Sequence, residues 1–175
     1  MERGARFSWA WRDLACMAVH VVGLISDTHG QVRPDVHTAL AGVEMILHAG
    51  DVGEGVLDEL GLIAPVRAVF GNTDDPGDPR LAAEFVYEAG GVSMHVSHGH
   101  ETGTPTPGKL FARYPQQVIV YGHTHRHLET LDGGRLAINP GAAGPRRFRL
   151  EPSVVRLTVR DGVVETELVR LATGD

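Results

Sequence analysis

Short apolar runs rich in β-branched residues recur along this chain, and each ends at Gly, Asn, Asp or Pro. Runs of this length are typical of buried strands, and several of the segments between them have the apolar spacing of helices. Strands are predicted at residues 19–26, 44–49, 66–70, 83–89, 92–97 and 117–121. Helices are predicted at 34–41, 54–61 and 108–114. This alternation predicts an α/β fold.

The last third of the chain has a different pattern. Four further short strands are predicted there, within "HLETL", "RLAINP", "SVVRLTVR" and "VVETELV". They are joined by "DGG", "GAAGP" and "DG", and residues of this kind favour the tight turns of hairpins. The C-terminal part is therefore predicted to be an antiparallel meander.

The length of 175 residues fits one domain, and 42% hydrophobic with 22% charged residues is typical of a globular protein. We expect residues 17–175 to form that single domain. Residues 1–16 are interpreted as an N-terminal extension outside the core, because the sequence from Met17 has the pattern expected where the first strand of a domain begins. Arg12 and Asp13 interrupt the apolar part of this extension, so it does not resemble a signal peptide.

Charge and cysteine content exclude several classes of function. A net charge of −6 argues against a broad nucleic-acid surface, which needs a clustered basic face. One basic cluster, "PRRFR" at 145–149, is interpreted as a solvated edge. The single cysteine, Cys16, allows no intramolecular disulfide and suits a reducing, cytoplasmic location. No apolar run approaches the roughly 20 residues that span a bilayer, so no membrane contact is expected.

Residues of the kinds that ligate metals, namely Asp, Asn and His, follow five of the first six predicted strands. Because ligand sites in α/β sheets form beyond the carboxyl ends of strands, these side chains are expected to converge. Three histidines also alternate in "YGHTHRH", and alternation alone fits the polar face of an exposed strand. One strand face does not explain the recurrence at five separate loops. The predicted set is Asp27, His29, Asp51, Asn72, His98, His123 and His125.

The seven side chains offer nitrogen and oxygen donors and no thiolate. Seven donors are too many for one tetrahedral zinc, so the sequence predicts two divalent ions, with Mn²⁺ favoured and Fe, Ni, Co or Zn as alternatives. A closely spaced metal pair needs a bridging carboxylate. Asp51 is the predicted bridge, because it follows small residues in "AGD" that permit close approach.

The order of these motifs resembles that of the calcineurin-like metallophosphoesterase superfamily, whose blocks are D-x-H, G-D, G-N-H/C, H-G-H and G-H-x-H. The chain has "DTH", "GD", "GNTD", "HGH" and "GHTH" in that order between residues 27 and 125, followed by "NPG" at 139–141. Their short intervals are most similar to those of the compact bacterial and archaeal phosphodiesterases. That group also contains a retromer scaffold subunit that lacks part of the catalytic set.

The resemblance implies a fold and a chemistry. The fold is a four-layer αββα sandwich of two mixed sheets flanked by helices. The first metal is assigned to Asp27, His29 and His125, the second to Asn72, His98 and His123, with Asp51 shared. The implied reaction is hydrolysis of a phosphodiester in a small phosphate-ester substrate by a metal-bound hydroxide. Relatives imply a homodimer or a homotetramer.

Two alternatives stay open. A phosphomonoesterase or a nucleotide pyrophosphatase would use the same metals. A non-catalytic scaffold would use the fold alone, but all seven ligand positions carry competent donors here. Residues 101–115 are the predicted specificity loop.

Thr73 stands where the fullest family pattern has a histidine that protonates the leaving oxygen, so the resemblance implies weak protonation of the leaving group here. Asp74 is a conceivable substitute acid, and His100 a candidate substrate contact. His127 is a weaker candidate. His48 is expected to orient ligands from behind. The remaining histidines, His20, His37 and His95, are expected to be structural or solvated.

Overall fold

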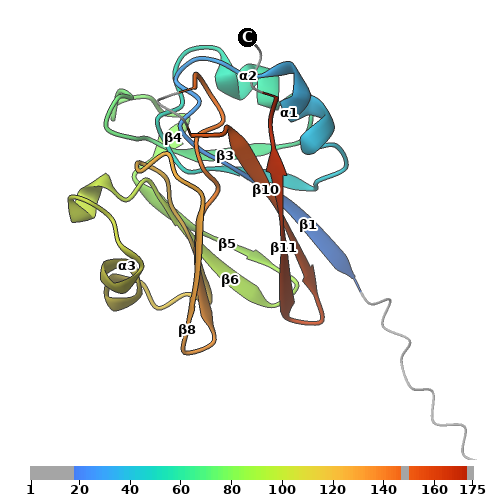
Figure 1. The fold of residues 1–175 in the computed structure, drawn as a ribbon, viewed down its shortest axis with the longest axis vertical. Helices are drawn as coiled ribbons and strands as arrows, with labels where there is room; N and C mark the ends of the chain where they lie inside the picture. The colour runs from blue at the N-terminus through green and yellow to red at the C-terminus, as the bar shows by residue number, and fades with distance from the viewer. Residues whose placement is uncertain (1–17, 147–149, 173–175) are drawn as a thin grey trace, which may run out of the picture.

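Two mixed β-sheets lie face to face in the computed structural model, which describes residues 18–146 and 150–172 (Figure 1). The first sheet has the order β11 (Val163–Arg170), β10 (Ser153–Arg160), β1 (Val19–Ile25), β2 (Met45–His48), β3 (Val66–Val69) and β4 (Leu81–Ala82). The second has the order β5 (Glu84–Ala89), β6 (Val92–Ser97), β7 (Val118–Val120), β9 (Arg135–Asn139) and β8 (Leu128–Asp132).

Parallel pairing dominates the middle of each sheet. Strands β1 to β4 are parallel, as are β6, β7 and β9, while β10, β11, β5 and β8 pair antiparallel with their neighbours. Parallel neighbours have their carboxyl ends at one edge of the sheet. The loops that follow β1, β2 and β3 therefore share one edge of the first sheet, and those that follow β6 and β7 share one edge of the second.

Apolar residues on alternate strand positions build separate layers of core, because successive side chains point to opposite faces. Leu24 and Leu47 pack between the two sheets, whereas Ile25 and Ile46 pack on the outer face of the first sheet. The helices α1 (Pro34–Ala39) and α2 (Val56–Leu60) cover that outer face.

A third helix, α3 (Pro107–Arg113), covers the outer face of the second sheet. Its Leu110 and Phe111 pack with Ile119 of β7 and Ala137 of β9. The layers are therefore helix, sheet, sheet and helix, and the expected αββα sandwich is confirmed. A short 3₁₀ helix, η1 (His100–Thr102), follows β6 and was not predicted.

The predicted C-terminal meander is wrong. Strand β9 pairs with β7 as well as β8, and β10 pairs with β1, so the two C-terminal hairpins belong to different sheets. The "GAAGP" segment is the connection between the sheets and not a hairpin turn. Along it, Ala143 N–H donates to Ser26 O (2.9 Å) and Gly144 N–H to Asp27 O (3.3 Å), bonds that hold the connection against the end of β1.

Residues 1–16, the predicted extension, lie outside the described residues, as does most of the "PRRFR" cluster. Strand β1 begins at Val19. Within the part of the chain that is described, no helix is both long and apolar enough to cross a membrane.

Candidate metal centre

The structure brings all seven predicted donors together beyond the strand ends. Asp27 and His29 follow β1, Asp51 follows β2, and Asn72 follows β3. The three remaining donors come from the second sheet, after β6 and β7: His98, His123 and His125. The carboxyl edges of both sheets therefore form one site from residues spread over nearly a hundred positions.

Four of the seven side chains form a compact group: Asp27, His29, Asp51 and His125 each place one ligand atom so that all four atoms lie within 4.8 Å of one another. His29 Nε2 and His125 Nε2 are 3.4 Å apart, and His125 Nε2 is 3.2 Å from Asp27 Oδ1. Nitrogen and oxygen donors at this spacing suit a divalent transition-metal ion.

The other three donors meet at the Asn72 side chain. Asn72 Oδ1 is 2.9 Å from His123 Nδ1 and 3.2 Å from His98 Nε2. The ring of His98 is buried, and its Nδ1 lies 2.7 Å from Ala49 O. Donation of the Nδ1 proton to that carbonyl orients the ring so that Nε2 faces the second group, the usual arrangement for a ligating imidazole.

Asp51 lies between the two groups and presents one carboxylate oxygen to each. Its Oδ2 is 3.8 Å from His29 Nε2, and its Oδ1 is 3.5 Å from His98 Nε2. Thr73 N–H also donates to Oδ1, at 2.9 Å. Burial alone would raise the pKa of the Asp51 carboxyl, but the hydrogen bonds from His98 and from Thr73 outweigh it and hold the pKa well below its usual range. The carboxylate is thus held ionised between two sets of donors.

The surroundings of the Asp27 carboxylate indicate whether a cation fits beside it. Its side chain is fully buried, and Oδ2 accepts a hydrogen bond from Ser26 Oγ at 2.6 Å. Oδ1 is also buried, accepts no hydrogen bond from any described residue and lies 3.2 Å from His125 Nε2. A buried carboxylate oxygen without a hydrogen bond is costly, and a bound cation removes that cost. The residues present therefore fit a divalent ion at this position.

The backbone at the site is strained. Five of the seven donors, namely Asp27, His29, Asp51, His123 and His125, have positive φ angles between 46° and 69°. Among the other non-glycine residues that are described, Asp161 alone shares this conformation, and it lies in the β10–β11 turn. Such backbone geometry costs of order 1–3 kcal/mol per residue and is concentrated at functional sites in proteins.

Two glycines permit the close packing of the ligand loops. A Cβ at Gly71, in "GN", would overlap the Asp51 carboxylate, and a Cβ at Gly122, in "GH", would overlap Ser26 Oγ. These steric conflicts explain why glycine precedes a ligand in both motifs.

His48 lies beneath the site and joins the first two ligand loops. Its Nδ1 accepts from Gly50 N–H (3.2 Å), and its Nε2 lies 2.8 Å from Thr28 Oγ1, which donates to Val52 O (2.8 Å). Complete burial lowers the pKa of His48 to about 4 despite the nearby carboxylates. His48 is therefore neutral at pH 7 and holds the loops in place, as its position in the sequence had suggested.

Asp74 has a different environment from the one expected of an acid. Its two carboxylate oxygens accept hydrogen bonds of 2.8–3.0 Å from the backbone N–H groups of Val52, Gly53 and Gly71. These N–H groups flank Asp51 and Asn72. Because both oxygens accept from backbone N–H groups and join two ligand loops, this geometry favours a positioning role for Asp74, and its role as a proton donor stays a prediction.

The other two predicted catalytic residues lie at the rim. Thr73 is exposed, and its backbone N–H contacts Asp51. The ring of His100 is 5.3 Å from that of His98 and 6.4 Å from that of His123, between centroids. Its buried Nδ1 has no hydrogen-bond partner among the described residues. His100 therefore stays a candidate for substrate contact.

The histidines expected to be structural lie outside the centre. His20 and His37 pair with Glu44 and Glu59, at 3.0 Å and 3.2 Å. The ring of His95 stacks on Tyr114 with 3.6 Å between centroids. His127 Nδ1 lies 3.0 Å from Asn139 O and so binds the backbone.

Sequence reasoning missed three supporting residues. Ser26 and Thr28 flank Asp27 and bind the ligand loops, as described above. Asn139 Nδ2 donates to Gly122 O (2.7 Å) and to Thr124 Oγ1 (3.0 Å), and so holds the loop that carries His123 and His125. The "NPG" motif signalled Asn139 without indicating what it contacts.

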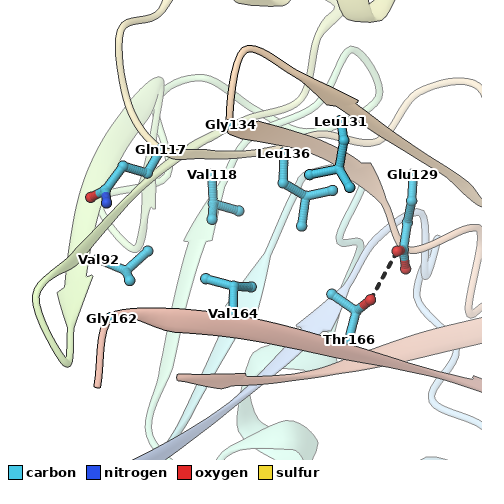
Figure 2. Close-up of a pocket in the computed structure, with 10 residues that line it drawn as sticks. All are labelled: Val92, Gln117, Val118, Glu129, Leu131, Gly134, Leu136, Gly162, Val164 and Thr166. Atoms are coloured by element: carbon cyan, nitrogen blue, oxygen red, sulfur yellow. Dashed lines mark hydrogen bonds between the residues drawn. The ribbon is translucent and has the colours of Figure 1, made fainter. Parts of the chain in front are cut away.

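A separate cavity of about 250 Å³ lies between the sheets, lined by residues of β6 to β9 and β11. Figure 2 shows its apolar side chains and the 2.8 Å hydrogen bond from Thr166 to Glu129 at one side. None of the seven predicted ligands lines it. The seven predicted donors lie elsewhere, beyond the strand ends.

Comparison with known proteins shows the family. The chain belongs to the calcineurin-like phosphoesterase superfamily, whose domain model matches residues 21–162. A protein of Methanothermobacter thermautotrophicus named "Probable metallophosphoesterase" is 30% identical over 86% of this chain and 92% of its own. A phosphodiesterase of Methanocaldococcus jannaschii is 28% identical over 69% of this chain and 82% of its own.

Solved structures share the fold. Vacuolar Protein Sorting 29 from Cryptosporidium parvum has a TM-score of 0.73 at 21% identity, covering 89% of this chain and 99% of that protein. A structure described as a novel archaeal phosphodiesterase has a TM-score of 0.69 at 22% identity, covering 87% of this chain and all of that protein. At these identities, the likeness concerns the fold alone.

Proposed function

We propose that this chain is a binuclear metal-dependent phosphodiesterase. The observation that carries the proposal is the position of Asp51, whose two oxygens face two separate groups of nitrogen and oxygen donors. The relatives named for metallophosphoesterase and phosphodiesterase activity support the same reaction class. When bound, two divalent ions would lower the pKa of water and neutralise the charge on phosphoryl oxygens.

The side chains divide between two ions. Asp27, His29 and His125 would hold the first ion. Asn72, His98 and His123 would hold the second, and Asp51 would contact both. The donor set includes no thiolate, which favours Mn²⁺, with Fe, Ni, Co or Zn as alternatives.

The proposal needs no covalent intermediate, because a metal-bound water would supply the nucleophile and none of the seven donors is a serine or a cysteine. Thr73 at the rim offers a hydroxyl that donates a hydrogen bond but is a poor proton donor near neutral pH. Weak protonation of the leaving oxygen favours diesters with good leaving groups over alkyl monoesters.

The alternatives make different predictions. A phosphomonoesterase or nucleotide pyrophosphatase would prefer monoesters or pyrophosphates over diesters with the same metals. A scaffold would hydrolyse none of these substrates with any of the metals. The likeness to the Vacuolar Protein Sorting 29 structure does not favour the scaffold, because it concerns fold alone.

The test is a panel of aryl phosphodiesters, monoesters and pyrophosphates, assayed with Mn²⁺, Ni²⁺, Zn²⁺ and Mg²⁺ in turn. We expect diester hydrolysis that chelation abolishes, with about two ions per chain in metal analysis. Asp51→Asn should lower both metal occupancy and hydrolysis more than Asn72→Ala, because it removes a charge near both ions. Asp132→Asn, at the exposed end of β8, is the matched control. One ion per chain at full activity would refute the binuclear site.

A further inference from the structure

Two grooves of opposite charge border the candidate metal centre. One begins at His125, has a volume of about 380 Å³, and contains Arg126, Arg170 and Glu151. A small hollow that shares His125 and Glu151 with it adds Arg146. The other groove begins at Thr73 and measures about 260 Å³. Its charged side chains are four acids and one base: Glu54, Asp74, Asp75, Asp78 and Arg80.

The positive charge in the groove at His125 is not neutralised by the residues that the structure describes. Arg170 forms an ion pair with Glu151 at 2.7 Å, so this arginine and the only acid of the groove's described lining balance each other. Arg126 and Arg146 are exposed and form no ion pair or hydrogen bond with any residue in 18–146 or 150–172. Within the described ranges, two guanidinium groups therefore have no protein partner that would compete with an anion.

The groove at Thr73 has an excess of negative charge. Asp78 pairs with Arg80 at 2.8 Å, and Asp74 is bound by backbone N–H groups. Glu54 and Asp75 remain without a cationic partner among the described residues. A ligand with a negatively charged arm is repelled from this side and attracted to the other.

The groove at His125 also suits an organic group. Leu150 and Leu168 form an apolar part of its wall, and its volume lies in the range of small-molecule sites. Arg126 follows His125 directly, so its attachment point is fixed by a residue of the first donor group. A phosphodiester held at the metals would have one arm beside this wall.

We propose that the groove at His125 is the subsite for the non-leaving arm of the substrate, and that Arg126 and Arg146 select an arm that carries its own negative charge. The substrate class is then a phosphodiester with a carboxylate or a second phosphate on that arm. This inference rests on the proposed phosphodiesterase function. Guanidinium groups suit both anions, because they offer paired N–H donors.

The test compares two 4-nitrophenyl phosphodiesters whose second arm is a phenyl ring with either a carboxylate or a carboxamide. With the full 175-residue chain and Mn²⁺, we expect kcat/KM to be about fivefold higher for the carboxylate, the upper end for an exposed ion pair, through a lower KM. Arg126→Gln should reduce this ratio, and a further Arg146→Gln should bring it to one. Added salt should also reduce it.

Arg160→Gln is the matched control, because it removes one exposed positive charge at the far end of β10 and should keep the ratio. Calorimetry with the two corresponding non-hydrolysable phosphonates measures the same preference as a ratio of dissociation constants. Equal constants, or a preference that survives in the double variant, would overturn the subsite. A preference in binding without hydrolysis of either diester would leave the subsite in place and refute the phosphodiesterase instead.

Discussion

Asp74→Asn tests whether this carboxylate holds the ligand loops or donates a proton. In the native chain, Oδ1 accepts from Val52 and Gly53 N–H, and Oδ2 accepts from Val52 and Gly71 N–H. An asparagine keeps one acceptor oxygen and replaces the other with an NH₂ group that cannot accept. Either orientation of the amide leaves one N–H group without its partner.

The more favourable orientation of the amide leaves Gly53 N–H without its acceptor. Gly53 is exposed, so water can bind its N–H, whereas Gly71 is buried. The loss is then one hydrogen bond, about 1 kcal/mol, with a similar loss from weakening the two charge-assisted bonds that remain. We expect a fall of about 2 kcal/mol in the free energy of unfolding. For a chain of this size, the corresponding fall in Tm is roughly 4–8 °C.

The assay is urea unfolding of the metal-free protein, followed by circular dichroism, together with metal titration of the folded protein. Metal affinity should fall as well, because the three N–H groups flank Asp51 and Asn72. Asp75→Asn is the matched control, since its exposed carboxylate accepts one hydrogen bond, from Gly77 N–H at 2.8 Å. If Asp74→Asn keeps full stability and metal affinity but stops hydrolysis of esters with poor leaving groups, Asp74 is the acid and this reasoning is wrong.

Three further predictions follow from the described contacts. The pKa of His48 is lowered from 6.5 to about 4, so between these pH values the unfolded chain binds more protons than the folded chain. The free energy of unfolding should therefore fall by about 2 kcal/mol from pH 7 to pH 5. Urea unfolding at both pH values measures this, and an unchanged pH slope in His48→Gln would contradict it. Thr73→His should accelerate esters with poor leaving groups selectively, by on the order of 10²-fold, in a plot of rate against leaving-group pKa; a uniform change across the series would count against a missing acid. Removing residues 1–16 should leave Tm and hydrolysis nearly unchanged, because β1 begins at Val19, and a large fall in either would show that the segment packs on the domain.

The sequence by itself determined most of the strands and helices and which donor residues follow the strands, whereas the four layers came from the family resemblance. Strand periodicity and helical spacing are local properties, and they placed the strands that end before Asp27, Asp51, Asn72 and His98. Parallel strands then require their following loops to share an edge. The convergence of the donors was therefore predictable without any coordinates.

Only the tertiary structure decided which strands pair and what each polar group contacts. "GAAGP" has the composition of a hairpin turn, yet β10 pairs with β1, and the connection binds the backbone at Ser26 and Asp27. Asp74 has the chemistry of an acid, but N–H groups from two other loops surround its carboxylate. The opposite charges of the two grooves likewise combine residues distant in sequence. Pairing, acceptor geometry and local charge depend on non-local contacts, which residue spacing does not encode.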